Sequence, residues 1–292
     1  MPELPEVETI IRKLRQGQPV EPGLPPYPSP VGQTVTKVWI DWPRSARPSA
    51  ETIIEALPGN RFESVGRRGK YIVFSLSPAS HSSPGSNKPP PKYLLIHLKM
   101  SGRIHVLEAG VPREKHVHFA FRLENGYELR LDDARKFGRV YLLNDLYQVT
   151  GHLGPEPLED TFTLDVLTRL MAKKSGGLKA LLLDQSFIAG IGNIYADESL
   201  WRAKIHPVRR ANTLEDKEIA ALRRAIRAAL RDGIKHGGAA IDWVYPEGKY
   251  QDHFRVYGRT DKPCRRCKTK IERIHVGQRS THFCPSCQPE IG

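Results

Sequence analysis

The sequence is poor in cysteine, with four among 292 residues. That is too few for a disulfide-rich secreted scaffold, so the spacing of the cysteines is more informative than their number. Apolar runs are short as well: YLLIHL and ALLL have the size of core segments, far below the roughly 18 residues of a membrane span. The first residues, MPELPEVETI, lack the basic and apolar regions of a secretory signal. We therefore expect a cytoplasmic protein with reduced thiols.

Acidic residues are scarce relative to basic ones. The chain has 32 Asp and Glu against 45 Lys and Arg, a net charge of +13, and most of the excess lies in residues 201–292. Such a surface attracts polyanions such as nucleic acid. A basic surface that only maintains solubility is the alternative interpretation at this point.

The length favours two domains, each large enough for its own core. Two segments rich in Pro, Gly and Ser, residues 16–30 and 77–91, have the composition of loops without a fold of their own. Short β-rich segments predict a sandwich or a barrel in the first half of the chain. They cover residues 34–40, 70–76, 93–98, 102–107, 116–123, 127–131 and 138–143.

Helical patterns occur at the start of the chain and in its second half. Pro5 suits a helix start, and the apolar residues Val7, Ile10, Ile11 and Leu14 follow at helical spacing. This pattern predicts an amphipathic helix packed on the sheet. After the turn residues of 151–160, helical runs follow at 162–173, 178–184, 193–203 and 213–236.

The last helical run, residues 213–236, has a recognisable start and a basic polar face. Thr213 and Asp216 fit a capping box, which would satisfy free N–H groups of the first turn. The polar face suits either a solvated surface or a contact with nucleic acid. It carries Arg223, Arg224, Arg227 and Arg231.

The cysteines form two pairs with metal-ligand spacing. Cys264 and Cys267 are separated by two residues, sixteen residues follow, and Cys284 and Cys287 repeat the two-residue spacing. This pattern predicts a four-thiolate zinc site, and redox disulfides are the alternative. The intervening segment alternates and has a Gly-Gln turn at 277–278, so we expect a zinc-clamped β-hairpin that carries Arg273 and Arg279. Four thiolates leave no open position for water, so the zinc would be structural.

The N-terminal residues are chemically unusual. Pro2 after Met permits removal of the initiator, which leaves a secondary amine beside the carboxyl group of Glu3. An α-amine titrates near 8, so a sizeable fraction is an unprotonated nucleophile at neutral pH. The alternative is that Pro2 and Pro5 only stiffen a helix entrance.

Nearly the whole chain resembles the bacterial formamidopyrimidine-DNA glycosylases. The resemblance rests on nine motifs, of which the first and the last are the most specific. They are MPELPEVET at 1–9, RRGKYI at 67–72, IHLKMSG at 96–102, EKHVHF at 114–119, DARKFGR at 133–139, GHLGPEPL at 151–158, GIGNIYADE at 190–198, VYGR at 256–259 and QRSTHFCPSC at 278–287.

The resemblance implies an α+β protein. Residues 1–152 would form an N-terminal catalytic β-sandwich domain with a flanking helix. Residues 153–237 would form a helix-two-turns-helix DNA-binding domain, and residues 238–292 a lesion-covering loop and a four-cysteine zinc finger. The implied function is that of a monomeric base-excision-repair enzyme that binds damaged double-stranded DNA. It would excise 8-oxoguanine and formamidopyrimidines and then cut the abasic strand by β,δ-elimination.

The same resemblance implies the roles of individual residues. Pro2 would be the nucleophile that forms a Schiff base at the sugar C1′, Glu3 the general acid, and Glu6 its support. Lys70 matches the lysine of β-elimination and Arg279 the arginine of δ-elimination. Phosphate clamping would involve Lys70, His97, Asn193 and Arg279, and further DNA contacts His116, Lys174 and Tyr257.

A flipped base leaves a gap in the duplex, and three residues match the family's insertion triad that fills it. They are Met100, Arg135 and Phe137. Without the resemblance, Met100 and Phe137 would be predicted as core residues. Lys99 departs from the family's usual Gly, and the segments 16–30 and 77–91 look like insertions.

Two other functions stay open on this evidence. One is an endonuclease VIII-like glycosylase for oxidised pyrimidines, against which MPELPEVET and the triad argue. The other is a noncatalytic zinc-finger DNA-binding protein, which Pro2 and Glu3 make the less favoured interpretation.

Overall fold

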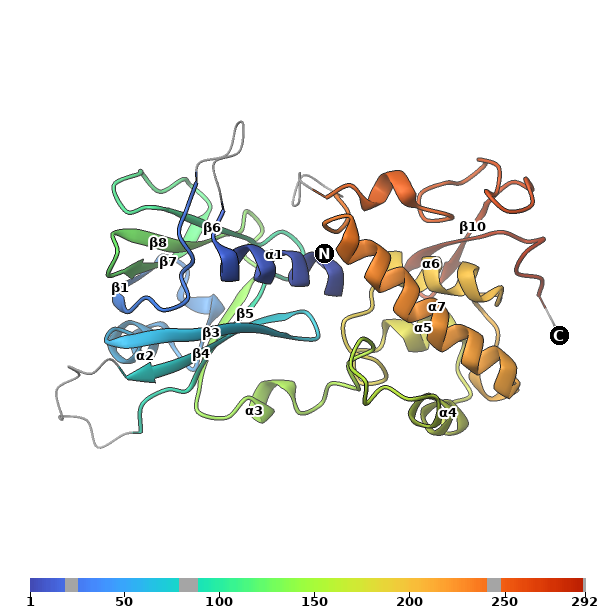
Figure 1. Cartoon of the computed structure of the whole chain (residues 1–292), viewed down its shortest axis with the longest axis horizontal. Helices are drawn as coiled ribbons and strands as arrows, with labels where there is room; N and C mark the ends of the chain where they lie inside the picture. Colours follow the sequence, from blue (N-terminus) through green and yellow to red (C-terminus); the bar gives the residue numbers. More distant parts are fainter. Residues whose placement is uncertain (19–25, 79–88, 241–247, 291–292) are drawn as a thin grey trace. The chain divides into compact units, whose positions relative to one another are not determined.

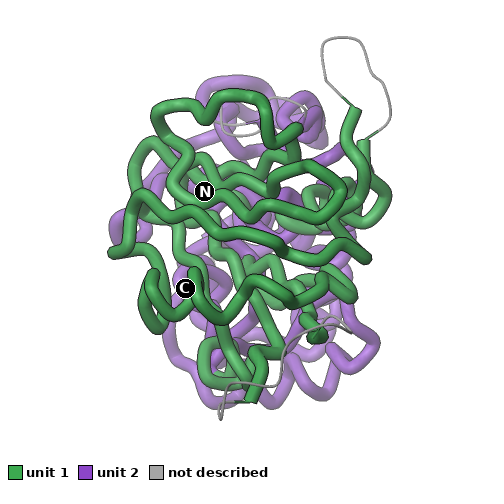
Figure 2. Tube along the Cα trace, turned by 90° about the vertical axis from the view of Figure 1, so that its left-hand side faces the viewer, with its two compact units in different colours: residues 1–2, 7–151 green, residues 3–6, 152–292 purple. Residues whose placement is uncertain are grey.

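The computed structural model describes residues 1–18, 26–78, 89–240 and 248–290. Parts of three expected segments lie outside the described residues: 19–25 of the first Pro-rich segment, 79–88 of the second, and 241–247 of the lesion-covering loop. The chain divides into two compact units (Figure 2). Unit 1 comprises residues 1–2 and 7–151, and unit 2 comprises residues 3–6 and 152–292.

Unit 1 is built on two β-sheets (Figure 1). One sheet has the strand order β1-β7-β8-β6 and the other β2-β9-β5-β4-β3. The paired strands are antiparallel except β2 and β9, which run parallel. The strands are β1 Val35–Ile40, β2 Ala46–Arg47, β3 Asn60–Arg68, β4 Tyr71–Pro78, β5 Tyr93–His97, β6 Arg103–Glu108, β7 Val117–Leu123, β8 Tyr127–Asp132 and β9 Arg139–Leu143. The predicted sandwich is confirmed, and the barrel alternative is wrong.

The core of unit 1 consists of apolar residues on the inner faces of its strands. Phe62 and Phe74 pack with ring centroids 4.5 Å apart, and Phe119 and Phe121 are fully buried. Helix α1 (Leu4–Gln16) confirms the predicted N-terminal helix, since its apolar stripe is buried. The Arg15 side chain donates from Nε to the Val65 carbonyl of β3 at 2.8 Å, which fixes the end of the helix on that sheet.

The sequence patterns did not predict strands β2 and β3, helix α2 (Ala50–Ala56) or the short helix α3 (Tyr147–Thr150). In β3 only Asn60, Phe62 and Val65 are buried, and the register shifts between Phe62 and Ser64, so the apolar alternation is interrupted. Helix α2 has seven residues, too few for a clear period, and begins where Ser49 Oγ accepts the N–H of Thr52 at 3.1 Å. Helix α3 follows β9 near the end of unit 1.

Unit 2 contains the four predicted helices and a two-stranded hairpin. The helices are α4 Leu164–Ala172, α5 Leu178–Leu183, α6 Asn193–Ala203 and α7 Asp216–Lys235, and the strands are β10 Glu272–Val276 and β11 Arg279–Phe283. Helix α6 packs against both α7 and β11. Residues 194–201 of α6 are all buried, so this helix is the centre of the unit. Tyr195 of α6 stacks on Tyr250 with a centroid distance of 5.3 Å.

The expected start of α7 needs correction. The capping box uses Glu215 and Glu218 rather than Thr213 and Asp216, because the helix begins at Asp216, whereas Thr213 belongs to a preceding 3-10 turn. Glu215 N–H donates to Glu218 Oε2 at 2.9 Å. The arginine face is also only partly solvated. Arg227 is 9% exposed and donates to the Pro157 and Glu159 carbonyls, so it holds the loop before α4 in place.

Among the described residues, no helix is long and apolar enough to cross a membrane.

Candidate nucleic-acid interface and metal centre

The carboxylate of Glu3 occupies the N-terminus of helix α6. It accepts hydrogen bonds from the backbone N–H groups of Gly192 at 2.7 Å, Ile194 at 3.0 Å and Tyr195 at 3.4 Å. Glu3 is 3% exposed, so the free N–H groups of the helix and a buried carboxylate satisfy each other. A Cβ atom on Gly192 would lie 2.3 Å from Glu3 Cδ, which explains the need for glycine there.

Glu6 fixes the backbone of Glu3 from the first turn of α1. Its Oε2 accepts the N–H of Glu3 at 2.9 Å, and its Oε1 accepts the Tyr195 hydroxyl and the Ala239 N–H, each at 2.8 Å. Burial, with a smaller contribution from the charges of Glu6 and Glu3, raises the pKa of Tyr195 well above its usual value. Tyr195 therefore stays a hydrogen-bond donor. Both carboxylates thus anchor the residues that follow Pro2.

Lys70 and His97 lie on neighbouring strands of unit 1. Lys70 directly precedes β4 and is 5% exposed, and His97 ends β5 and is 8% exposed. Burial, and then the charges of Lys99 and Lys70, lower the pKa of His97 to about 3. The ring is therefore neutral at physiological pH. Since its Nδ1 lies 2.9 Å from the N–H of Lys99 and accepts that hydrogen, Nε2 carries the ring hydrogen and is suited to donate to a phosphate oxygen.

The proposed insertion residues are exposed, contrary to the core interpretation of the apolar pair. Met100 is 40% and Phe137 48% exposed. The Arg135 guanidinium lies 5.9 Å from the centre of the Phe137 ring. All three side chains belong to turns of unit 1, and large exposed apolar side chains of this kind are typical of contact surfaces.

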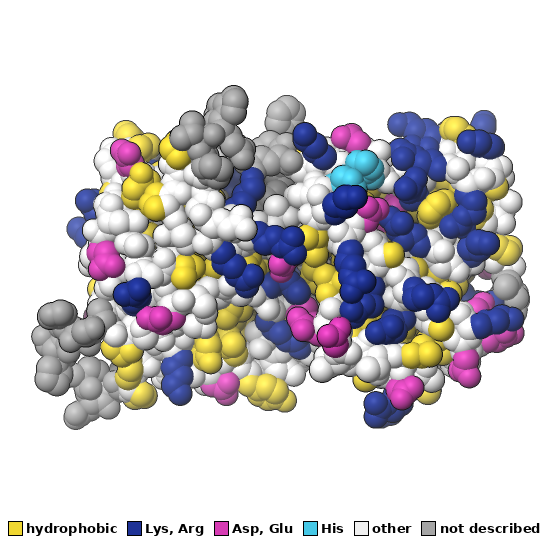
Figure 3. Space-filling view, in the orientation of Figure 1, with side chains coloured by type: hydrophobic (Ala, Val, Ile, Leu, Met, Phe, Trp, Pro, Cys, Tyr) yellow, Lys and Arg dark blue, Asp and Glu magenta, His cyan; other side chains and the backbone are white. Residues whose placement is uncertain are grey.

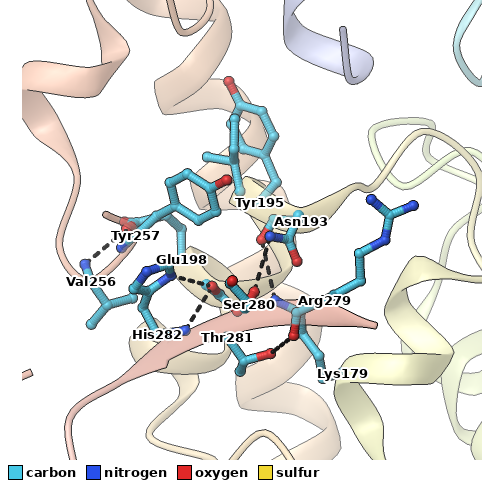
Figure 4. Close-up of polar contacts among 12 residues, drawn as sticks. Lys179, Asn193, Tyr195, Glu198, Val256, Tyr257, Arg279, Ser280, Thr281 and His282 are labelled. Atoms are coloured by element: carbon cyan, nitrogen blue, oxygen red, sulfur yellow. Dashed lines mark hydrogen bonds and ion pairs between the residues drawn. The ribbon is translucent and has the colours of Figure 1, made fainter. Parts of the chain in front are cut away.

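Asn193 connects the start of α6 to the hairpin strand that begins with Arg279. Its Nδ2 donates to the Ser280 carbonyl at 3.0 Å, and Figure 4 shows the two segments side by side. Deeper in unit 2, Asp197 forms an ion pair with Lys179 and accepts the backbone N–H of His282 at 2.9 Å. The hairpin is therefore held to α6 at two points.

Several residues of this network were not predicted from the sequence. Lys179, Asp197 and Glu198 looked like ordinary helix positions, although two of them belong to the motif GIGNIYADE. Glu198 is fully buried and accepts the N–H groups of Arg255, Val256 and Tyr257, and burial raises its pKa. Asp197 and Glu198 are adjacent buried carboxylates, and buried charges need partners. The sequence alone does not show that these two positions are buried.

The remaining predicted DNA contacts lie in both units. His116 precedes β7 in unit 1 and is half-buried, and Lys174 follows α4 in unit 2 and is half-buried as well. Tyr257 packs its ring against Phe254 and His282. Figure 3 shows that Lys and Arg side chains gather on the visible face of unit 2, where the sequence places most of the positive charge.

The four cysteine sulfurs converge on one point. They all lie within 4.8 Å of one another, with 4.0 Å between Cys264 and Cys287 and 3.4 Å between Cys267 and Cys284. Tetrahedral zinc with bonds of about 2.3 Å needs sulfurs about 3.8 Å apart, so the residues fit this ion. The indole N–H of Trp201 donates to Cys264 Sγ at 3.4 Å, as expected around a zinc-bound thiolate. The predicted hairpin over the site is confirmed, with its turn at 277–278.

Three successive segments of the chain match models of known protein families. Residues 1–140 match the model of the formamidopyrimidine-DNA glycosylase N-terminal domain, and residues 153–244 match that of the H2TH domain of the same enzymes. The chain belongs to the formamidopyrimidine-DNA glycosylase family. Residues 261–289 match a zinc finger found in these glycosylases and in IleRS, so the four cysteines form a structural zinc site.

Individual members of the glycosylase family match this chain over almost its full length. The enzymes of Chloroflexus aggregans and Herpetosiphon aurantiacus are 44% and 43% identical over 99% of the chain, and the match covers 98% and 100% of the relatives. A crystal structure of Lactococcus lactis Fpg (MutM) with DNA containing N7-benzyl-Fapy-dG is 34% identical. It covers 99% of this chain and 100% of its own, with a TM-score of 0.85.

Proposed function

We propose that the protein is a bifunctional DNA glycosylase and abasic-site lyase that acts on damaged double-stranded DNA. Its substrates would be 8-oxoguanine and formamidopyrimidines. The observation that carries this proposal is the anchoring of the N-terminal segment: Glu3 and Glu6, both 3% exposed, hold the backbone directly after Pro2 through hydrogen bonds to α6 and Ala239. An amine that must attack one carbon atom needs such a fixed position. Lactococcus lactis Fpg, a similar protein, was crystallised with Fapy-dG DNA and with abasic-site DNA, which supports the substrate class.

In the proposed first step, the secondary amine of Pro2 attacks C1′ of the damaged nucleotide and the bond from C1′ to the base breaks. The base leaves with the electron pair of that bond and takes a proton from water. The carboxylate of Glu3 takes up the proton that the attacking nitrogen must lose. It then delivers this proton to the ring oxygen as the sugar opens, so that an iminium ion joins Pro2 to C1′. One carboxylate therefore serves as base and then as acid, and its hydrogen bonds from three N–H groups fix its position for both transfers.

In the proposed later steps, the iminium ion makes the C2′ proton acidic, and the 3′ and then the 5′ phosphate leave by β- and δ-elimination. Lys70 serves the first elimination and Arg279 the second. Together with His97 and Asn193 they bind the phosphates next to the lesion. Met100, Arg135 and Phe137 fill the space of the extruded nucleotide, and Arg135 bonds to the cytosine that has lost its partner.

The test is chemical trapping of the iminium ion. The protein without Met1 is mixed with a duplex that contains 8-oxoguanine, and borohydride is added during the reaction. We expect a covalent DNA adduct on the N-terminal peptide. Protein that retains Met1, or whose terminus is acetylated, should give none, whereas Pro2→Gly keeps an amine and should retain some lyase activity.

The same experiment separates the alternatives. A duplex with an oxidised pyrimidine tests the endonuclease VIII-like function, which predicts faster release of that base than of 8-oxoguanine. The two rates must be compared because Lactococcus lactis Fpg, a similar protein, was itself crystallised with DNA that contains an oxidised pyrimidine. Binding without strand cleavage on either duplex would indicate a noncatalytic DNA-binding protein. An adduct on Lys70, or one that survives a blocked terminus, would contradict the mechanism but leave the substrate class intact.

A further inference from the structure

Two turns of unit 1 carry the three proposed insertion residues, and the strand order places these turns next to each other. The first turn, residues 98–102, connects β5 in the five-stranded sheet to β6 in the four-stranded sheet. The second, residues 133–138, returns from β8 in the four-stranded sheet to β9 in the five-stranded sheet. Since β5 pairs with β9 and β6 pairs with β8, both crossovers lie at the same end of the sandwich.

The side chain of Asp133 connects these two turns. Asp133 is 2% exposed, and its Oδ1 accepts a hydrogen bond from the hydroxyl of Ser101, the residue after Met100. Within its own turn, the same carboxylate accepts the N–H of Arg135 at 3.3 Å and the N–H of Gly138 at 2.6 Å. One buried carboxylate is therefore bonded to the side chain that follows Met100 and to the backbone N–H groups of Arg135 and of the residue after Phe137.

The backbone of Asp133 extends this connection to a third motif. Its N–H donates to the carbonyl of His116 at 2.8 Å, and its carbonyl accepts the N–H of Lys136 at 3.0 Å. Asp133 thus joins IHLKMSG, EKHVHF and DARKFGR, which are distant in the sequence. From the other side of the turn, Arg139 Nη1 donates to the carbonyls of Phe137 at 2.9 Å and Gly138 at 2.8 Å.

Two glycines make these close approaches possible. The N–H of Gly102 donates to the Leu98 carbonyl at 3.0 Å and closes the first turn. A Cβ atom on Gly102 would lie 2.7 Å from that carbonyl oxygen. A Cβ atom on Gly138 would lie 3.1 Å from Asp133 Oδ2. The backbone of both turns is therefore bonded and tightly packed while the side chains at their tips, Met100 and Phe137, remain exposed. This combination presents apolar side chains without allowing them to collapse onto the protein.

We propose that Asp133 and Ser101 are positioning residues that set the distance between Met100 and the Arg135–Phe137 turn, and thereby the discrimination of the base opposite the lesion. This inference rests on the proposed insertion role of the three residues. The reason is geometric. Arg135 can bond to the widowed base only if the wedge formed by Met100 and Phe137 holds the duplex open in a fixed register.

The test uses Ser101→Ala, which removes the hydrogen bond from Ser101 to Asp133 and leaves the bonds of the Asp133 carboxylate to the N–H groups of Arg135 and Gly138 intact. The rate of base release is measured on 8-oxoguanine opposite cytosine and opposite adenine. We expect the ratio of the rate opposite cytosine to the rate opposite adenine to fall about tenfold, because a hydrogen bond to a charged group is lost. Ser101→Thr keeps the hydroxyl and should restore the ratio. Ser77→Ala is the matched control, since Ser77 Oγ donates to Glu63 at 2.5 Å elsewhere in unit 1.

Cleavage of a pre-formed abasic site in single-stranded DNA gives the readout that separates positioning from general damage. This substrate has no opposite base, so Ser101→Ala should cut it at the normal rate. A general structural defect would lower both activities together and would overturn the inference.

A double variant with Arg135→Ala completes the design. If Ser101 acts through the insertion turns, Ser101→Ala should add nothing to the loss caused by Arg135→Ala. If Arg135→Ala loses the preference for cytosine while Ser101→Ala keeps it, the positioning role fails alone. If Arg135→Ala itself keeps the preference, the insertion assignment fails, and the positioning role fails with it.

Discussion

The carboxylate of Glu3 accepts the backbone N–H of Gly192 at 2.7 Å, although 189 positions separate the two residues in the sequence. Gly192 has φ −133° and ψ −159°, a backbone conformation that any residue can adopt. The requirement for glycine therefore comes from space rather than from the backbone: a Cβ atom would lie 2.3 Å from Glu3 Cδ.

This relationship predicts the effect of Gly192→Ala. The added methyl group should displace the Glu3 carboxylate while the backbone remains unstrained, and a displacement of about 1 Å typically costs about 100-fold in rate. Single-turnover release of 8-oxoguanine measures the loss. Gly176→Ala is the control, because its Cβ would meet its nearest neighbour at an ordinary 3.8 Å. Normal base release by Gly192→Ala would show that the position of Glu3 does not limit the reaction.

Salt dependence should distinguish two of the proposed phosphate contacts. Each neutralised phosphate contributes a slope of about −0.9 to log K against log salt. Lys70→Ala should therefore make the slope shallower by about 0.9 on a duplex with an uncleavable abasic-site analogue. His97→Gln should weaken binding without changing the slope, because a pKa of about 3 keeps the imidazole neutral. Equal slopes for Lys70→Ala and the unmodified protein would remove Lys70 from the phosphate contacts.

The buried His97 also predicts how stability depends on pH. Its pKa of about 3 in the folded protein lies below the value near 6.5 of an unfolded chain, so the unfolded state binds more protons between these values. Stability is complete above about pH 6.5 and falls as the pH falls. Between pH 7 and pH 5 the loss from His97 should be about 2 kcal/mol. Urea unfolding at both pH values should show a correspondingly smaller loss for His97→Gln, and an equal loss in the two proteins would contradict the neutral buried ring.

Removal of one zinc ligand should separate the hairpin from the rest of the chain. Cys284→Ser should abolish zinc binding and open the hairpin, in which Arg279 is the first residue of β11. Binding to lesion-containing DNA should become weaker, while unit 1 stays folded. Metal analysis and circular dichroism of the purified protein measure the first and last of these effects. Ser286→Ala, between the two ligands Cys284 and Cys287, should leave all of them unchanged. Full zinc content in Cys284→Ser would contradict the four-ligand site.

Local sequence patterns predicted the structure correctly where it depends on residues that are close in the sequence. The two-residue spacing of Cys264 and Cys267 and of Cys284 and Cys287 brings each pair of sulfurs together whatever the rest of the chain does. Likewise, Val7, Ile10, Ile11 and Leu14 predict a buried helix face because they lie on one side of any α-helix. Strand β3 and the start of α7 were mispredicted where a register shift and a 3-10 turn interrupt the period.

What the sequence by itself determined is therefore the α+β composition, the zinc hairpin and the motifs that identify the family. The tertiary structure alone decided that Met100 and Phe137 are exposed rather than buried, that Glu3 caps a helix 189 positions away from it, and that Asp133 joins three motifs. The physical reason is the range of the interactions. A helix or a metal knuckle forms from contacts within a few residues. The meeting of the two crossover turns depends instead on the pairing of β5 with β9 and of β6 with β8, and the capping of α6 by Glu3 depends on the packing of unit 2.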